Sequence, residues 1–159
     1  MLRPKRKKRL SDFSGGKNYP VFIILSAFFT CGLLISYKYS LTGIALYFGL
    51  WIISYFTIYA GTCRYCVYHG KKCPVPLEGS CAHHFFDKKE NGFGNSQFFW
   101  AAMAYILRII LPVVIIFRKT LYVYGIIYFG LFITYWVVHL FCTGCPNCTN
   151  GKCPLNPDY

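Results

Sequence analysis

Long apolar segments alternate with short polar stretches along this chain. Four segments contain almost only hydrophobic and small residues: 20–37, 43–60, 98–117 and 121–141. Each is close to the roughly 20 residues that an α-helix needs to cross the hydrocarbon core of a bilayer. Few residues join the first segment to the second and the third to the fourth, and connections this short produce antiparallel hairpins. The pattern therefore predicts an all-α membrane protein with four transmembrane helices in two hairpins.

The polar stretches complete the predicted organisation. The two hairpins cover residues 20–60 and 98–141, so the remaining stretches lie on one side of the membrane. They are a basic flexible tail at 1–19, a cysteine-containing loop at 61–97 and a cysteine-rich tail at 142–159. The first of these consists largely of Lys, Arg, Ser, Gly and Pro, which cannot build a hydrophobic core.

Positive charge predicts the orientation. Of the seventeen Lys and Arg residues, thirteen lie in the two tails and the long loop, whereas three, Lys38, Arg118 and Lys119, lie in the hairpin turns. Cytoplasmic segments carry such an excess, so we expect an integral membrane protein with cytoplasmic N- and C-termini. The net charge is +12, and all charged residues except Arg108 lie outside the apolar segments. That arrangement favours an anionic lipid bilayer as the partner over nucleic acid.

The two halves of the chain share a pattern that indicates an internal duplication. Tyr-Phe-Gly-Leu occurs at residues 47–50 and again at 128–131. In each half this motif is followed by Cys-x2-Cys and then by Cys-Pro, at Cys73-Pro74 and Cys153-Pro154. Because both hairpins run in the same direction, we expect a parallel repeat about an axis along the membrane normal. Each duplicated hairpin is thus followed by a cytoplasmic cysteine-containing segment.

Eight cysteines form two groups of four, and a ninth, Cys31, lies alone in an apolar segment. The groups are Cys63, Cys66, Cys73 and Cys81, and Cys142, Cys145, Cys148 and Cys153. Cytoplasmic thiols stay reduced, so such groups are typical of metal binding. The second group reads C-x2-C-x2-C-x4-C-P, one residue longer than the bacterial ferredoxin motif. We expect two iron–sulfur clusters of the 4Fe–4S type, with zinc as the alternative.

The chain resembles membrane-anchored ferredoxin-like proteins, such as the quinol-dehydrogenase membrane components. The resemblance covers the four spans and the motifs at 63–74 and 142–154. Those families use C-x3-C-P and carry an added ferredoxin domain, and this chain has neither feature. The resemblance implies an electron-transfer subunit of a hetero-complex in the cell membrane of a prokaryote. It would pass electrons between a soluble cytoplasmic donor and a membrane acceptor or quinone.

Two other functions fit the same residues. Zinc bound by the thiolates would make the protein a zinc-stabilised membrane scaffold or interaction protein. Two C-x2-C pairs in a four-helix bundle would also suit a membrane thiol-disulfide oxidoreductase, similar to the vitamin K epoxide reductase type. The expected cytoplasmic orientation stands against this last function, because its thiols usually face the oxidising side.

Arg108 is the charged residue deep inside an apolar segment, where charge is costly and usually functional. It could bind a quinone as a cofactor, or balance the negative charge of a thiolate cluster. It could also satisfy backbone groups that Pro112 frees.

His139 is expected to be an interfacial residue without a ligand role. With five Asp and Glu residues, the chain is better suited to electron transfer than to being a complete enzyme, and its basic rim would attract a soluble redox partner with an acidic face.

Overall fold

The computed structural model describes residues 7, 10–13, 16, 18–90, 93–151 and 153–156. Within this part of the chain it is helical and contains no strand. Four helices are long and apolar enough to span a membrane: α1 (Tyr19–Tyr39), α2 (Leu41–Gly61), α4 (Asn95–Lys119) and α5 (Tyr122–Val137). The prediction of an all-α protein with four candidate transmembrane helices is therefore confirmed.

Four shorter elements follow the second and fourth helices. They are η1 (Cys63–Tyr65), α3 (Glu78–Phe85), the π-helical turn η2 (Val138–Thr143) and η3 (Cys145–Asn147). The predicted loop at 61–97 thus contains a helix, α3, which begins where the Pro74–Pro76 stretch ends. The fourth predicted apolar segment is α-helical to Val137 and then widens into the π-helical turn.

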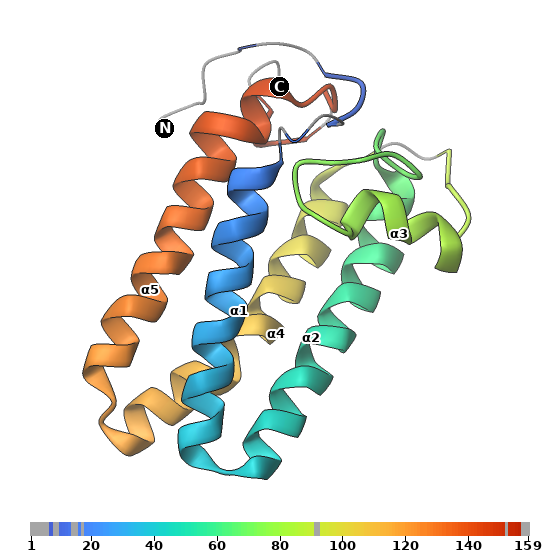
Figure 1. The fold of residues 1–159 in the computed structure, drawn as a ribbon. Coiled ribbons are helices and arrows are strands. Elements are labelled where there is room, and N and C mark those ends of the chain that lie inside the picture. The colour runs from blue at the N-terminus through green and yellow to red at the C-terminus, as the bar shows by residue number, and fades with distance from the viewer. Residues whose placement is uncertain are drawn as a thin grey trace.

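The four long helices form two antiparallel hairpins that pack side by side (Figure 1). Helix α1 packs against α2, α4 and α5, and α2 packs against α4. The hairpin turns lie at one end of the bundle, whereas α3, η3 and the described residues before α1 lie at the other (Figure 1). In the first turn Ser40 caps α2, because its Oγ accepts a hydrogen bond from Gly43 N at 3.0 Å. Both cysteine-containing segments are consequently gathered at the same end.

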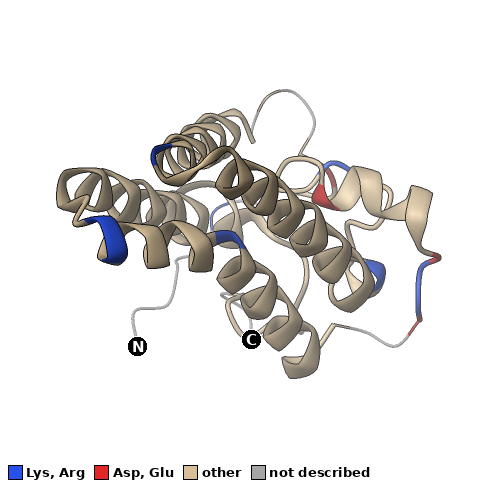
Figure 2. Ribbon diagram, turned by 90° about the horizontal axis from the view of Figure 1, so that it is seen from below, with Lys and Arg blue, Asp and Glu red and all other residues tan. Residues whose placement is uncertain are grey.

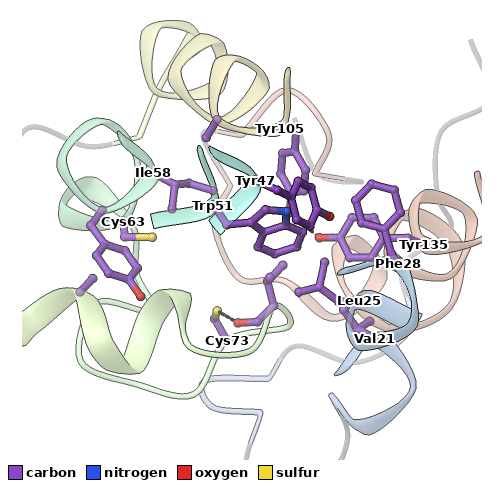
Figure 3. Packing of buried hydrophobic residues seen from close by; sticks show 14 of the residues in the cluster. Val21, Leu25, Phe28, Tyr47, Trp51, Ile58, Cys63, Cys73, Tyr105 and Tyr135 are labelled. Carbon is purple, nitrogen blue, oxygen red and sulfur yellow. Dashed lines mark hydrogen bonds between the residues drawn. The ribbon is translucent and has the colours of Figure 1, made fainter. Parts of the chain in front are cut away.

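Aromatic side chains fill the interior of the bundle, while apolar side chains cover its outside. Phe28 stacks on Tyr128 with ring centroids 4.5 Å apart, and Trp51 lies close by in the same core (Figure 3). The helix walls carry little charge, and most charged residues lie at helix ends and in loops (Figure 2). Large exposed side chains such as Ile126 and Phe117 face outward. Such an apolar exterior is suited to lipid.

Glycine allows close contact at some helix surfaces and not at others. A Cβ atom at Gly32 would stand 2.2 Å from Tyr47 Oη, and one at Gly61 would stand 2.5 Å from Trp100 Cβ. In contrast, a Cβ at Gly49 or Gly130 would meet nothing within 4 Å. The paired glycines of the Tyr-Phe-Gly-Leu motif therefore face open space, whereas Gly32 and Gly61 are two of the positions at which packing needs a missing side chain.

Candidate functional site

Six cysteines line one cavity at the end of the bundle. They are Cys63, Cys66 and Cys73 from the first cysteine-containing segment, and Cys145, Cys148 and Cys153 from the second. The cavity measures about 160 Å³ and its other walls are largely apolar, with side chains such as Ile58 and Phe98. The sulfur atoms of Cys63 and Cys73 lie at the edge of the packed core (Figure 3). Residues about 80 positions apart in the sequence thus share one site.

The two Cys-x2-Cys motifs adopt the same local structure. Each occupies a 3₁₀ turn that follows a long helix. The N–H of Cys66 donates to the carbonyl of Cys63 at 3.1 Å, and the N–H of Cys148 donates to that of Cys145 at 3.2 Å. The φ and ψ angles are −84° and 149° at Cys66, and −73° and 138° at Cys148. The turn brings both cysteines of each motif to the cavity.

Backbone and side-chain N–H groups are directed at several of these sulfur atoms. Gly79 N lies 3.3 Å from Cys73 Sγ, and Asn150 N lies 3.4 Å from Cys148 Sγ. The Asn150 side chain also reaches across to the other motif, with Nδ2 at 3.9 Å from Cys66 Sγ. Such donors stabilise thiolates and are a main influence on the properties of thiolate-bound metal centres.

Burial keeps the thiols protonated in the metal-free protein. It raises the pKa of Cys66 to about 12, and the nearby Cys148 and Cys153 thiols act in the same direction. Burial also raises the pKa of Cys73, although the N–H of Gly79 opposes the shift. The pKa of Cys153 is raised for the same reason. Thiols with raised pKa values are poor nucleophiles, whereas metal ligation removes the proton directly.

The remaining two predicted ligands lie elsewhere. Cys81 is half-buried on α3, and Cys142 is exposed in the π-helical turn η2. Neither lines the cavity. All cysteines are free thiols, and in the described part of the chain no group of three or more His, Cys, Asp or Glu side chains stands close enough to hold a metal ion. The assignment of four cysteines to each of two centres stays a prediction.

Arg108 is fully buried beneath the cavity and its guanidinium group is held by internal partners. Its Nε donates to Ser54 Oγ at 2.8 Å, and its Nη2 donates to Glu78 Oε1 at 3.2 Å. The rings of Trp51, Tyr55 and Tyr105 surround it, with centroids 4.6 to 4.9 Å from Cζ. Among the described residues, Nη1 has no hydrogen-bond partner.

Glu78 links this buried cation to the cysteines. It begins α3, lines the cavity and is 6% exposed. Burial raises the pKa of its carboxyl group, and the charge of Arg108 opposes that rise. The carboxyl group also contributes to the raised pKa of Cys73. Glu78 at the start of α3 and Arg108 in α4 thereby form an ion pair next to the thiols. Sequence patterns did not indicate this pair.

Pro112 affects the backbone of the same helix rather than the guanidinium group. Proline has no N–H, so the carbonyl of Arg108 loses its partner within α4. Tyr128 Oη donates to this carbonyl at 3.2 Å. A tyrosine from α5, and not the side chain of Arg108, therefore satisfies the freed group.

Residues before α1 pack against both cysteine-containing segments, and we call residues 10–13 the N-terminal strap. Leu10 N donates to Asn147 O at 3.0 Å, and Phe13 N donates to Lys72 O at 2.9 Å. Phe13 is 1% exposed and packs edge-on against Tyr68. This part of the segment predicted to be flexible is packed, because the apolar Leu10 and Phe13 interrupt its polar composition.

Tyr68 connects the strap to both cysteine-containing segments. Its hydroxyl group donates to Leu10 O at 2.6 Å and accepts from Thr149 N at 3.0 Å. The ring belongs to the segment between Cys66 and Cys73. One side chain thus joins three stretches of chain that are far apart in the sequence, and sequence patterns carry no signal for such a contact.

A second cleft lies on the outer side of Cys66. It measures about 550 Å³ and is lined by Tyr65, Cys66, Val67, Lys88, Lys89 and Glu90. The N–H of Lys89 donates to Arg64 O at 2.8 Å, so the lysine-bearing segment is fixed to the Cys-x2-Cys turn. Cys66 therefore lines both the inner cavity and a basic cleft on the surface.

The fold and the site define a four-helix membrane protein with a cysteine-lined cavity at one end of the bundle. Comparisons with protein-family models, with curated proteins and with solved structures found no match.

Proposed function

We propose that this protein is a membrane-bound iron–sulfur electron-transfer subunit. The single observation that carries the proposal is the convergence of six thiols, three from each half, on one cavity. Several thiolates are the usual ligands of iron–sulfur clusters. The proposed ligands are Cys63, Cys66 and Cys73 in one half, and Cys145, Cys148 and Cys153 in the other. Metal binding has to draw the sulfurs closer together, as is common where binding is coupled to local folding.

The environment of the thiols favours metal binding over thiol exchange. Reactive cysteines have lowered pKa values, whereas burial raises that of Cys66 to about 12. The N–H groups of Gly79 and Asn150 are placed to support sulfur that carries negative charge. A thiol-disulfide oxidoreductase needs the opposite balance, with a thiolate that is stable before any reaction.

Arg108 supports the same function as a counter-charge. Its guanidinium group is enclosed by three aromatic rings and pairs with Glu78, which lines the cavity. A quinone has no access to a fully buried group held in this way. We propose that Arg108 offsets the charge of Glu78 beside the thiols and so favours thiolates there; balancing the charge of a thiolate cluster is one of the three roles expected from the sequence.

The soluble electron donor would bind at the cleft beside Cys66. Lys88 and Lys89 give it positive charge, and Val67 adds an exposed apolar contact. A soluble donor with an acidic face around its redox group would be attracted to such a cleft. Electrons would then enter at Cys66, which lines both this cleft and the inner cavity. Of the nine described Lys and Arg residues outside the apolar segments, six lie at this end of the bundle, which supports its cytoplasmic location: Lys7, Arg64, Lys71, Lys72, Lys88 and Lys89.

The membrane acceptor of the electrons would bind in a groove on the outside of the bundle. It measures about 350 Å³, lies between α1 and α2, and is lined by aromatic residues such as Phe29 and Tyr55. Pro76 and Leu77, from the loop that carries Cys73, close its end. An apolar groove open to lipid suits a quinone ring or an apolar membrane partner, and it supports a membrane acceptor within a hetero-complex.

An internal duplication explains why each half of the chain supplies three of the proposed ligands. Helix α2 packs on α4 as α5 packs on α1, which is the relationship expected if α1 corresponds to α4 and α2 to α5. Tyr47 and Tyr128, at corresponding positions, are both fully buried. The two Cys-x2-Cys turns have matching geometry. We infer that a duplicated hairpin placed each half's cysteines at the common axis.

The test is anaerobic purification in mild detergent, followed by measurement of iron, acid-labile sulfide and zinc. We expect iron with sulfide, and a broad visible absorption that dithionite bleaches. Cys66→Ser and Cys148→Ser should each lose most of this signal. Cys142→Ser, which changes an exposed cysteine outside the cavity, is the matched control and should retain it.

Folding is checked separately by circular dichroism and size-exclusion chromatography of each variant. Zinc without sulfide in the wild-type protein would overturn electron transfer and favour the scaffold. Iron and sulfide that persist in Cys66→Ser and Cys148→Ser but disappear in Cys142→Ser would overturn the ligand assignment.

A further inference from the structure

We propose that the groove between α1 and α2 binds the ring of a quinone, and that Ser26 and Tyr55 donate hydrogen bonds to its carbonyl oxygens. This inference rests on the proposed function and deepens it, because it names a quinone rather than an apolar protein partner as the membrane acceptor. Ser26 lies on α1 and Tyr55 on α2, and both line the groove. Binding at this place requires no metal in the cysteine-lined cavity.

Two hydroxyl groups in the groove are unpaired. Among the described residues, neither the Ser26 nor the Tyr55 hydroxyl group forms a hydrogen bond. Five serine and threonine side chains elsewhere in the long helices donate to a carbonyl oxygen of their own helix at 2.8 or 2.9 Å: Thr30, Ser36, Ser54, Thr57 and Thr134. An unpaired hydroxyl group in an apolar environment is costly, so these two indicate a ligand that accepts hydrogen bonds.

The depth of the two residues restricts the kind of ligand. Helices α1 and α2 each have 21 residues. At about 1.5 Å per residue they just cross a hydrocarbon core of about 30 Å. Ser26 follows the start of α1 by seven residues, and Tyr55 precedes the end of α2 by six. Both therefore lie about 10 Å inside the core, where phospholipids have only acyl chains, which accept no hydrogen bonds. The ligand has to carry its acceptor atoms into hydrocarbon.

The walls of the groove favour a flat, neutral ring. Phe22, Phe29, Phe48 and Trp51 contribute aromatic side chains, which pack well against other rings. No charged side chain lines the groove, so a charged ligand would have no counter-charge there. Its volume of about 350 Å³ lies within the range of about 300–1,000 Å³ that small-molecule sites have. A neutral ring with two carbonyl oxygens that dissolves in a bilayer is a quinone.

Neighbouring residues hold Tyr55 and the end of the groove in place. Arg108 Cζ lies 4.6 Å from the centroid of the Tyr55 ring, and this cation–π contact fixes the ring. Leu77 closes the groove with a φ of 66°, a left-handed conformation that is uncommon for residues other than glycine. Tyr59 Oη donates to the carbonyl of Leu77 at 3.0 Å and stabilises this conformation. Strained residues of this kind occur at ligand clamps.

The test is a titration of the purified, metal-free, full-length protein in lipid nanodiscs with a decyl-substituted benzoquinone. Trp100→Phe and Trp136→Phe leave Trp51, which lines the groove, as the sole tryptophan, so its fluorescence reports binding. We expect quenching that saturates. In this background Ser26→Ala and Tyr55→Phe should each weaken binding by about threefold to tenfold, which is the loss expected for one hydrogen bond.

The infrared carbonyl band of the bound quinone is a second readout, and it uses a protein with all its tryptophans. Hydrogen bonds lower the carbonyl stretching frequency, so the band should lie below that of the same quinone in lipid alone. Ser26→Ala and Tyr55→Phe should each shift it part of the way back. Thr30→Val is the matched control, because Thr30 lines the same groove but its hydroxyl group already donates to its own helix. It should change neither affinity nor band.

Three results would overturn the inference. Quenching that rises without saturation would show that the quinone only dissolves in the lipid. Wild-type affinity and an unchanged carbonyl band in both Ser26→Ala and Tyr55→Phe would show that the two hydroxyl groups do not bind it. Quenching of Trp51 by phospholipids with brominated acyl chains, without saturable quenching by the quinone, would show that an acyl chain fills the groove.

The quinone titration and the metal analysis can fail separately, because the quinone probe needs no metal. Iron with sulfide, but no saturable quinone binding, would remove this inference and leave the electron-transfer subunit with a protein acceptor. Saturable quinone binding in a protein that holds neither iron nor sulfide would support the groove and remove the iron–sulfur function.

Discussion

Glu78 Oε1 accepts a hydrogen bond from Arg108 Nη2 at 3.2 Å, and this ion pair joins α3 to the middle of α4. Arg108 has no exposed surface and Glu78 has almost none. The pair therefore connects the cysteine-containing loop to the interior of the transmembrane bundle. Because both side chains are buried, each charge needs the other to offset the cost of its removal from water.

Removing one partner of this pair should be more harmful than removing both. Glu78→Gln leaves the guanidinium group buried without a counter-charge, and we expect it to destabilise the protein by about 3–5 kcal/mol. The double variant Glu78→Gln/Arg108→Met should recover much of that loss. Unfolding in a mixed-detergent titration measures both changes. Glu90→Gln, at an exposed position, serves as the control and should have no effect. An equal loss in the single and double variants would show that the pair is not energetically coupled.

Two glycines should respond differently to the same substitution. Gly32→Ala places a Cβ 2.2 Å from Tyr47 Oη, which itself donates to Phe29 O, so the tyrosine has to move. We expect a destabilisation of about 1–3 kcal/mol. Gly49→Ala meets no atom within 4 Å and should be neutral or slightly stabilising, because alanine favours helix. Thermal unfolding in detergent compares the two variants. Similar effects from both would argue against the packing of α1 on α2 described above.

The thiol of Cys66 should react slowly in the metal-free protein. Burial raises its pKa from 9.0 to about 12, so at pH 8 its thiolate fraction is about a thousandfold lower than that of an ordinary thiol. Alkylation by iodoacetamide, followed by mass spectrometry, should label the exposed Cys142 first. Urea should remove the difference between the two sites. Rapid labelling of Cys66 at pH 8 in the folded protein would contradict this prediction.

The same raised pKa has a consequence for stability. Between about pH 9 and pH 12 the unfolded chain has lost the Cys66 proton, while the folded metal-free protein still holds it. Ionisation then favours the unfolded state, so the stabilising contribution is complete below pH 9 and declines as the pH rises through this window. Denaturant titrations at pH 8 and pH 10.5 test the sign, with Cys66→Ser as the variant that should lose this part of the pH dependence.

The N-terminal strap should loosen when Tyr68 loses its hydroxyl group. Tyr68→Phe removes hydrogen bonds to Leu10 and Thr149 while the ring remains, and we expect a cost of about 1–3 kcal/mol. Hydrogen–deuterium exchange should increase at the Phe13 amide, which is bonded to Lys72 O. Tyr65→Phe, in the neighbouring 3₁₀ turn, is the control. Unchanged exchange in Tyr68→Phe would mean that Phe13 alone holds the strap.

The helices could be predicted because hydrophobic length carries a strong signal. Each apolar segment corresponds to a helix, and α4 begins at Asn95, only slightly before the predicted residue 98. The end of the fourth segment was less predictable. The spacing between Tyr128 and Cys145 is one residue longer than that between Tyr47 and Cys63, but this difference does not indicate whether a loop or a π-helical turn accommodates it.

The candidate site could be predicted only in part. The repeated Cys-x2-Cys and Cys-Pro pattern indicated the six cysteines that line the cavity. Cys81 and Cys142 complete two sets of four by number only, because a count does not show where a side chain points, and α3 and η2 place these two cysteines outside the cavity lining. Glu78, at the start of α3, and His139, in the π-helical turn, also line the cavity, and neither position has a periodic signal in the sequence.

The bonds between the N-terminal strap and the second Cys-x2-Cys turn constrain how the protein is made. Leu10 is synthesised before any of the four long helices, and Asn147, its hydrogen-bond partner, is synthesised after all of them. The wall of the cavity formed by Cys145, Cys148 and Cys153 does not exist while the ribosome is still producing α5. The cavity can be completed only after all four long helices have been synthesised. Any group that binds in it can therefore enter only at the end of translation or later.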